Sequence, residues 1–274
     1  MAHSVCVFGL GVVGLPTARY FQQQGYKVVG YDISATAVAK AKNWIEATDD
    51  LREIPSDIDV FVTCVSTKLS DDHPDASNVY DACRIISGYS PKLVSIESTV
   101  PVGTCRNIHN TVLDRQVNLV HVPHRYWEGD PRNYGVRQLR VAGAVDEESM
   151  VQACDFYHPL GIPLVEVEPI EVAEMSKIAE NSYRYVQIAF AEELCRICSR
   201  IGLDFNLLRS VCNSKWNVDI PEARDGIGGT CLPKDIRYVV EAAHEGDLEA
   251  DLLLSAIRAD KKYAKQLARP LVRA

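Results

Sequence analysis

The stretch SVCVFGLGVVGLPTARYF at residues 4–21 decides the fold. A valine-rich run leads into a glycine pattern and then into apolar residues at helical spacing, and a second apolar run, KVVGYD at 27–32, ends in Asp32. A strand, a glycine turn, a helix and a strand that ends in an acid form the dinucleotide-binding pattern. The turn lets a pyrophosphate rest on a helix N-terminus, and Asp32 favours NAD over NADP by bonding the ribose hydroxyls. The alternative is a tight strand-to-helix turn that binds no ligand.

Further runs rich in valine or isoleucine alternate with helical segments through residues 1–168. These runs are DVFVTCVS, KLVSIEST, VNLVHVP, LRVAGAV and IPLVEVE. The alternation predicts an α/β fold with a Rossmann-type, doubly wound parallel sheet, and it makes residues 1–168 the NAD-binding domain.

The residues after the last of these runs have a different pattern. Ile170 to Ile201 contains neither proline nor glycine, and Gly202 is a plausible helix stop. Shorter helical patterns at 204–213, 233–244 and 248–268 complete an all-helical second domain, 169–274. The long helix would measure about 45 Å, which is more than one small domain buries, so we expect it to lie in a dimer interface.

Composition narrows the class of protein. Of 274 residues, 47% are hydrophobic and 24% charged, which is typical of a soluble globular protein. The net charge of -8 argues against nucleic-acid and anionic-membrane partners. We expect a cytoplasmic protein, because no apolar run could span a bilayer, no basic leader precedes the first strand, and nine cysteines lack regular spacing. We expect no metal, because His121 and His124 have no third ligand at zinc-like spacing.

Four segments, in this order, resemble the UDP-glucose/GDP-mannose dehydrogenase family. They are FGLGVVGLP at 8–16, ESTVPVGT at 97–104, EVAEMSKIAENSY at 171–183 and GGTCLPKD at 228–235. The resemblance implies oxidation of a primary alcohol of a sugar, sugar nucleotide or nucleotide to a carboxylate with two NAD. It also implies a homodimer built on the long helix. The last residues of the chain fall near the end of the family's central domain, so the resemblance predicts a short form without the C-terminal nucleotide-binding domain.

The residues of the last two segments suggest the chemistry. Lys177 and Asn181 are four apart, so on a helix they share one face and can hold an oxyanion and a water. Cys231 precedes Pro233, a favoured first helical residue, so its thiol would face a helix N-terminus, with Lys177 or Lys234 nearby to favour the thiolate. The alternatives are the polar edge of a helix for the first pair and a structural thiol for Cys231.

The resemblance assigns roles to particular residues. It implies that Cys231 forms a thiohemiacetal and then a thioester, in a catalytic set of Cys231, Lys177, Asn181, Asp235, Thr99 and His124. It implies that NAD is held by Gly9, Gly11, Val12, Val13, Gly14, Asp32, Ser66, Thr67, Ser98, Thr99 and Glu128. The expected substrate contacts are Arg125, Tyr126, Arg224, Gly228 and Gly229.

One departure leaves the product open. His124 stands where the family has the glutamate that serves as base for thioester hydrolysis, so the product is either the acid or the aldehyde. Without the third domain we also expect a smaller substrate, with one anionic group held by Arg125 and Arg224. Two other interpretations stay open: a β-hydroxyacid dehydrogenase, which has no need of Cys231, and a catalytically silent NAD-binding protein.

Overall fold

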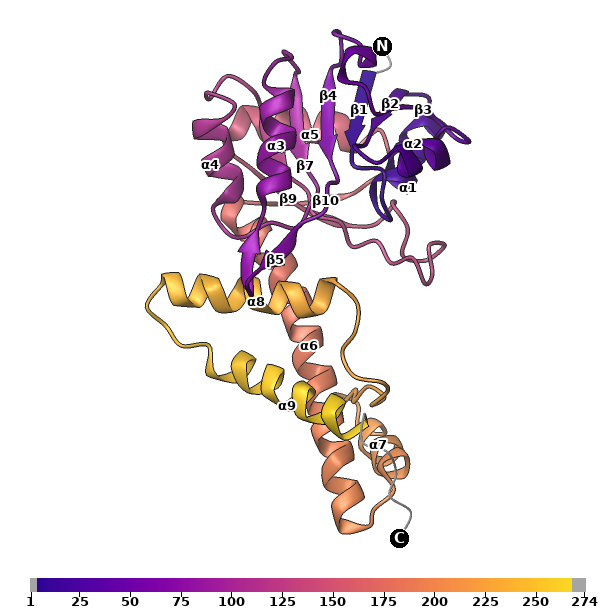
Figure 1. Cartoon of the computed structure of the whole chain (residues 1–274), viewed down its shortest axis with the longest axis vertical. Coiled ribbons are helices and arrows are strands. Elements are labelled where there is room, and N and C mark those ends of the chain that lie inside the picture. Colours follow the sequence, from indigo (N-terminus) through magenta and orange to yellow (C-terminus); the bar gives the residue numbers. More distant parts are fainter. Residues whose placement is uncertain (1–3, 268–274) are drawn as a thin grey trace. The chain divides into compact units, whose positions relative to one another are not determined.

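The structure, a computed structural model, describes residues 4–267 and divides into two compact units (Figure 1). The first unit consists of the chain up to Lys68 together with Asp75–Lys177. The second consists of Leu69–Pro74 and the chain from Ile178 onward. The units therefore divide at 177/178, nine residues beyond the boundary expected from the sequence.

An eight-stranded sheet forms the centre of the first unit. Its order is β10-β9-β8-β7-β4-β1-β2-β3. The strands are β1 (Ser4–Phe8), β2 (Lys27–Tyr31), β3 (Glu46–Thr48), β4 (Val60–Thr63), β7 (Leu93–Ile96), β8 (Leu119–His121), β9 (Arg140–Ala144) and β10 (Leu164–Val167). Because β1 lies between β2 and β4, the chain order reverses there. The predicted doubly wound sheet is confirmed, and this reversal is where such sheets bind ligands, beyond the carboxyl ends of the strands.

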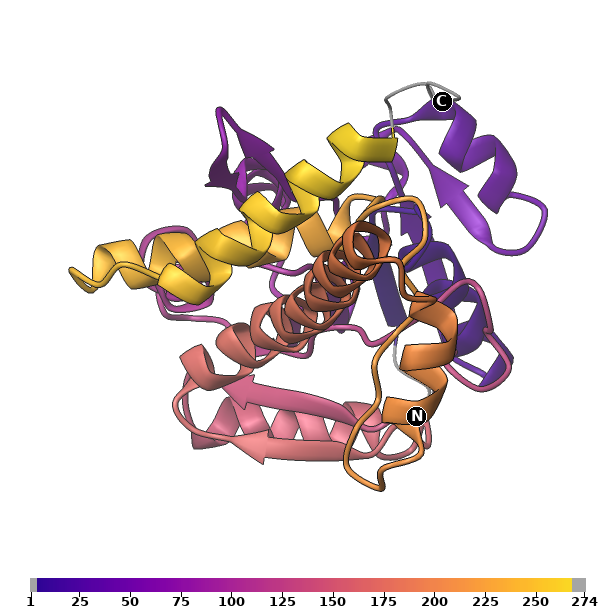
Figure 2. The same cartoon turned by 90° about the horizontal axis from the view of Figure 1, so that it is seen from below.

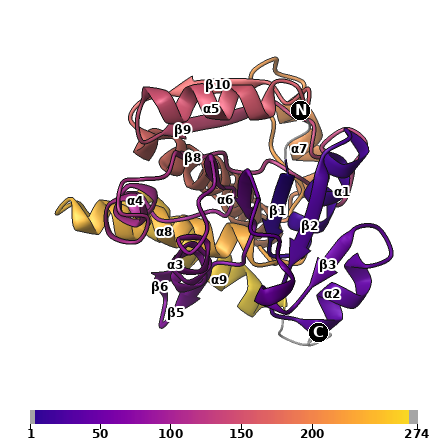
Figure 3. The ribbon, with the colours of Figure 1, turned by 90° about the horizontal axis from the view of Figure 1, so that it is seen from above.

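Helices cover both faces of this sheet (Figure 3). One core cluster joins residues of α1 (Gly14–Gln23), α2 (Ala35–Ala41) and α5 (Glu147–Tyr157) to the sheet. A second cluster joins α3 (Ser77–Ile86) and α4 (Thr104–Thr111) to the sheet. Side chains alternate between the faces of a strand, so Val5 and Val7 belong to the first cluster, and Cys6 and Phe8 to the second.

The sheet departs from the all-parallel prediction at one pair. β9 runs antiparallel to β8, while the other neighbouring strands are parallel. Parallel neighbours need a crossover, usually a helix, whereas residues 122–139 between these strands contain none. The small pair β5 (Lys68–Ser70) and β6 (His73–Asp75), the edge strand β3 and the 3₁₀ turn η1 (Leu51–Glu53) were also not foreseen.

The second unit is helical, as predicted (Figures 1 and 2). It contains most of α6 (Ile170–Ile201), together with α7 (Phe205–Asn213), α8 (Cys231–Glu245) and α9 (Asp251–Leu267). Gly202, at φ +75°, ends α6 in the left-handed conformation that glycine allows. The core of the second unit joins Tyr185 of α6, Ile236 of α8 and Ile257 of α9. Within residues 4–267, none of the helices combines the length and apolarity needed to cross a bilayer.

Contacts of Ile170 and Glu174 explain why the first two turns of α6 belong to the first unit. Ile170 lies in the second core cluster of the sheet. The buried carboxylate of Glu174 accepts hydrogen bonds from the backbone N–H groups of Gly103, at 2.5 Å, and Cys105, at 2.7 Å. These groups are unpaired donors at the N-terminus of α4, so Glu174 caps that helix and anchors the start of α6.

Candidate active site

The glycine turn after β1 is tight and open on one side. Gly9 has φ +88°, and a Cβ on Gly14 would lie 1.8 Å from the Gly9 carbonyl oxygen, so neither position accepts a larger residue. A Cβ on Gly11 would meet nothing within 4 Å. The backbone is therefore packed tightly on the inner side and leaves space at the start of α1. This arrangement fits the diphosphate of a dinucleotide.

Asp32 stands beside this turn at the end of β2. One carboxylate oxygen accepts the N–H of Leu10 at 2.7 Å, and the other accepts the N–H of Ser34 at 2.8 Å. These bonds fix the half-buried carboxylate next to the glycine turn. Each oxygen keeps a second lone pair, so Asp32 can still accept from ribose hydroxyls.

The loops after β4 and β7 are tied together next to the same turn. Thr67 Oγ1 donates to the Thr99 carbonyl at 2.7 Å, and Ser98 Oγ donates to the Val65 carbonyl at 2.7 Å. Because β1, β4 and β7 are neighbours, their carboxyl ends bring together the predicted cofactor residues of all three loops. These residues are Gly9, Gly11, Val12, Val13, Gly14, Ser66, Thr67, Ser98 and Thr99.

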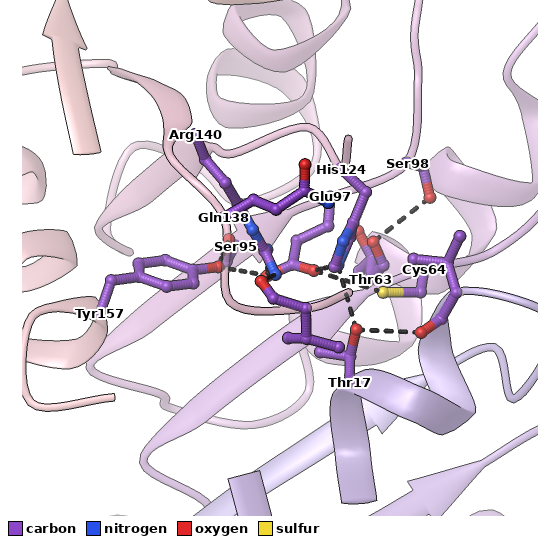
Figure 4. A network of polar contacts seen from close by, with 12 residues as sticks. Thr17, Thr63, Cys64, Ser95, Glu97, Ser98, His124, Gln138, Arg140 and Tyr157 are labelled. Atoms are coloured by element: carbon purple, nitrogen blue, oxygen red, sulfur yellow. Dashed lines mark hydrogen bonds and ion pairs between the residues drawn. The ribbon is translucent and has the colours of Figure 1, made fainter. Parts of the chain in front are cut away.

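A buried polar network lies behind these loops, and it was not predicted from the sequence. Figure 4 shows the side chains of Tyr157, Arg140 and His124 pointing toward Glu97. Tyr157 donates to Glu97 at 2.5 Å, the Arg140 guanidinium lies 3.0 Å from the same carboxylate oxygen, and His124 Nε2 pairs with the other oxygen. Glu97 is only 3% exposed. Burial by itself raises the pKa of Glu97, but His124, Arg140 and Tyr157 stabilise the carboxylate and lower that pKa to about 2.

His124 is part of this network rather than an exposed base. Burial lowers the pKa of His124, and the charges of Arg140 and Lys177 lower it further, against the opposing effect of Glu97. The ring is therefore neutral, and Nε2 carries the hydrogen that Glu97 accepts. Nε2 also lies 3.1 Å from Thr17 Oγ1, whereas Nδ1 has no hydrogen-bond partner among the described residues. The basic lone pair of His124 is thus on Nδ1.

Cys64 brings a third donor atom close to Glu97 and His124. The ligand atoms of the three residues lie within 4.8 Å of one another. However, Arg140 already supplies the positive charge beside Glu97, and burial and Glu97 raise the pKa of the Cys64 thiol, which keeps it protonated. A divalent cation prefers deprotonated ligands and no cationic neighbour. We therefore interpret the cluster as a network of protein groups.

The second unit holds Asn181, Cys231 and Asp235 of the predicted catalytic residues, while Lys177 is the last residue of the first unit. Asn181 Nδ2 on α6 donates to Asp235 on α8 at 2.5 Å, and Lys234 lies 2.6 Å from the other carboxylate oxygen of Asp235. The helix begins at Cys231 itself, rather than at Pro233. Cys231 is exposed and four residues before the buried Asp235, so the two share one face of α8. Lys177 is half-buried one turn before Asn181 on α6.

The expected substrate residues contact other parts of the chain. Arg125 Nη1 donates to the Leu139 carbonyl at 3.0 Å, and Arg224 pairs with Glu222 at 2.8 Å. Tyr126 packs partly against the first core cluster, and Gly229 has φ +77°. Exposed residues among the predicted sites include Glu128, Gly228 and Gly229. The substrate-binding role of these residues stays a prediction.

Comparison with known families gives matches along most of the chain. The NAD binding domain of the UDP-glucose/GDP-mannose dehydrogenase family matches residues 3–46 and 39–161. The central domain of that family matches residues 171–262.

Individual relatives agree with these matches. A UDP-N-acetyl-D-mannosamine dehydrogenase of Methanococcus vannielii is 32% identical over 261 residues, which are 86% of this chain and 61% of the relative. An NDP-N-acetyl-D-galactosaminuronic acid dehydrogenase of Ralstonia nicotianae is 29% identical, over 88% of this chain and 65% of that protein. The solved UDP-N-acetylmannosamine dehydrogenase of Pyrococcus horikoshii superposes with a TM-score of 0.88 and 28% identity, over 97% of this chain and 70% of that one. The chain thus spans less than two thirds of the length of these curated relatives.

Proposed function

Because the chain belongs to the UDP-glucose/GDP-mannose dehydrogenase family, we propose that it oxidises a primary alcohol of a sugar nucleotide or a related sugar compound to a carboxylate. The observation that carries the proposal is the Asn181–Asp235 bond, on the face of α8 that also bears the exposed Cys231. The names of the relatives make UDP-N-acetylhexosamines the first substrates to test.

The cofactor of the proposed reaction is NAD, and the first unit contains the family's NAD-binding domain. The space beside Gly11 would take the diphosphate of NAD, and Asp32 would bind its ribose. The loops joined by the Thr67–Thr99 hydrogen bond would hold the remaining part of NAD. When bound, NAD accepts one hydride in each of two successive oxidations of the same carbon.

The thiol of Cys231 retains the substrate between the two oxidations. Its thiolate adds to the aldehyde carbon, and the carbonyl oxygen takes up a proton, which gives a thiohemiacetal. After this carbon is oxidised it is a thioester, and water attack releases the carboxylate and returns the thiol. Cys231 is the first residue of α8, where the backbone N–H groups have no partner within the helix.

We assign the handling of charge and water in this reaction to the other predicted catalytic residues. The Lys177 ammonium offsets the negative charge that develops on the alcohol oxygen as the hydroxyl proton passes to solvent water. Asp235 accepts from Asn181 and pairs with Lys234, so it is held in one orientation and can align a water. His124 stands at the position of the family's glutamate, and we assign to it the role of base for thioester hydrolysis, for which its buried Nδ1 would have to be reached by the attacking water.

The test is an assay of NADH release with sugar nucleotides, sugar phosphates and nucleoside monophosphates. We expect two NADH per molecule of sugar nucleotide oxidised. Tight NAD binding without NADH release from any of these compounds would favour a silent NAD-binding protein. Turnover of the smaller phosphates alone would instead favour the substrate class with a single anionic group.

Asp32 should set the cofactor preference. We expect NADP to bind much more weakly than NAD to the wild type, because the carboxylate repels a 2′-phosphate. Asp32→Asn should weaken the binding of NAD by about 10- to 100-fold, since hydrogen bonds to a charged acceptor contribute about 1.5–3 kcal/mol. Titration by calorimetry measures both constants, and Asp49→Asn, at an exposed position after β3, is the control. Equal wild-type affinities for the two cofactors would contradict the assignment.

We further propose that the chain forms a homodimer through α6. Exposed apolar side chains follow one another along this helix at spacings of seven, seven and four residues, namely Tyr183, Phe190, Ile197 and Ile201. Such spacing places them on one face, opposite the face whose Tyr185 enters the core of the second unit. A continuous exposed apolar stripe is typical of a protein interface.

Phe190→Glu should therefore break the dimer. Phe190 is 56% exposed, so the substitution leaves the core of the unit intact, but it would bury a charge in the proposed interface. We expect the dimer to weaken at least about tenfold, equal to about 1.4 kcal/mol. Light scattering across micromolar concentrations measures the change, with Arg184→Glu on the flank of the same helix as control. A wild type of single-chain mass at these concentrations would refute the dimer.

A further inference from the structure

A buried acid and a half-buried acid lie next to the segment that leads to Cys231. Glu192 on α6 is fully buried. Asp260 on α9 accepts the Tyr185 hydroxyl of α6 at 2.7 Å and the backbone N–H of Ile227 at 3.1 Å. Asp260 therefore connects α6 and α9 to Ile227, four residues before the proposed nucleophile.

The segment 226–230 depends on such outside contacts. Gly226 has φ +92° and Gly229 has φ +77°, conformations that cost glycine little and that other residues rarely adopt. Besides the Ile227–Asp260 bond, the Tyr263 hydroxyl of α9 holds the Arg224 carbonyl at 2.8 Å just before the segment. Its attachment to α9 thus fixes where α8 begins.

The buried carboxyl group of Glu192 lacks a donor among the described residues. Neither of its oxygens receives a hydrogen bond from a donor among the described residues, and its polar neighbour is the Asp260 carboxyl group. Two ionised carboxylates side by side in a protein interior repel each other. A proton on Glu192 removes this repulsion and makes Glu192 a donor to Asp260. Burial first, and then Asp260, raise the pKa of Glu192 to about 7.

We propose that Glu192 and Asp260 share a proton and act as a positioning pair, which holds Ile227 and so places Cys231 at the start of α8. This inference rests on the proposed function of Cys231. When Glu192 loses its proton, the repulsion displaces Asp260, and the bond to Ile227 weakens. The pair thereby makes the order of the segment before the nucleophile depend on pH.

The other charged and titratable groups around the pair come from α6, α8, α9 and the segment before α8. On α6 and α9, burial raises the pKa values of Tyr185 and Tyr263. On α8, Arg237 faces Tyr185 and is paired with Asp72 at 3.1 Å. Cys195, whose pKa is raised by burial, and Asp225 face Tyr263 rather than Glu192. With a pKa raised to about 7, Glu192 changes charge between about pH 6 and 8.

The test is hydrogen exchange of the Ile227 amide in the full chain, corrected for its intrinsic pH dependence. In the wild type we expect protection to fall about tenfold between pH 6 and 8, as Glu192 ionises. In Glu192→Gln the amide donates to Asp260 at every pH, so protection should stay flat. Glu193→Gln, exposed on the same helix, is the matched control and should behave as the wild type. Flat protection in the wild type, or an equal change in the control, overturns the proposal.

Two further measurements keep the inference separate from the proposed function. Asp260→Asn should lower Ile227 protection at both pH values, which serves as a second test if Glu192→Gln does not fold. Alkylation of Cys231, located by peptide mapping, speeds up with pH in any variant because the thiolate is the reactive form, so the comparison is between variants at each pH. The ratio of the wild-type rate to the Glu192→Gln rate should change between pH 6 and 8. Hydrogen exchange requires no turnover, so an inactive chain with the expected profile would contradict only the proposed function.

Discussion

Cys231→Ala is expected to stop carboxylate formation while NAD binding stays unchanged. Without the thiol the aldehyde has no nucleophile to hold it for a second oxidation, so acid production should fall on the order of a thousandfold or more. The first oxidation should continue slowly, because Lys177 and Asn181 remain. Mass spectrometry of the products, together with NADH counted per sugar consumed, measures the effect.

The exposure of Cys231 supports this choice among nine thiols. All nine lie within the described residues, and Cys231 is the exposed one, while the others are buried or half-buried. Cys212→Ala, at a half-buried thiol of α7, is therefore the matched control and should leave acid formation intact. Full acid yield from Cys231→Ala would exclude a thioester route. One NADH per substrate from both the wild type and Cys231→Ala would instead favour the single oxidation of a β-hydroxyacid dehydrogenase.

The fold was predictable where local patterns determine it. The glycine turn between β1 and α1, with Asp32 at the end of β2, could be recognised because its residues lie close together in the sequence. The absence of glycine and proline from Ile170 to Ile201 likewise predicted the full length of α6. The direction of β9 was not predictable in this way, because the 122–139 segment carries no periodic signal that fixes how it returns to the sheet.

The buried network shows what such patterns miss. Glu97 and Tyr157 are 60 residues apart, and Glu97 and Arg140 are 43 apart, so their contacts depend on the packing of β7, β9 and α5. One signal was present, since Glu97 directly follows the apolar run KLVSI and Arg140 directly precedes VAGAV. Charged residues at the ends of buried strands need a partner of opposite charge. Glu192 and Asp260 gave no comparable signal, because they lie within amphipathic helices.

Glu97→Ala is expected to have the largest effect on stability. The substitution leaves the fully buried Arg140 without its counter-charge and the Tyr157 hydroxyl without its carboxylate acceptor. Removing one partner of a buried ion pair costs about 3–5 kcal/mol. Denaturant unfolding of the first unit measures the loss, followed by the fluorescence of Trp44 and Trp127 in a Trp216→Phe background. Trp216 is 92% exposed, so its replacement should not affect the core.

The loss of stability caused by replacing Glu97 should depend on pH in a defined direction. The pKa of Glu97 is lowered in the folded chain to about 2, so its ionised form contributes stability above its ordinary pKa of about 4.5. That contribution is lost as the pH falls through the folded value. The difference in unfolding free energy between the wild type and Glu97→Gln should thus be largest near neutrality and shrink below about pH 4. Glu46→Ala, at an exposed position on β3, should change stability by no more than about 0.5 kcal/mol at any of these pH values.

A double substitution separates the cost of the unpaired charge from the loss of packing. If Glu97→Ala is costly because Arg140 is left uncompensated, then removing that charge as well, in Glu97→Leu with Arg140→Met, should recover much of the lost stability. Replacing a buried ion pair by apolar groups of similar size is often nearly neutral. The two sites contact each other, so their effects should be strongly non-additive. Additive losses would mean that the charge pairing of Glu97 with Arg140 contributes nothing to stability beyond the separate packing of the two side chains.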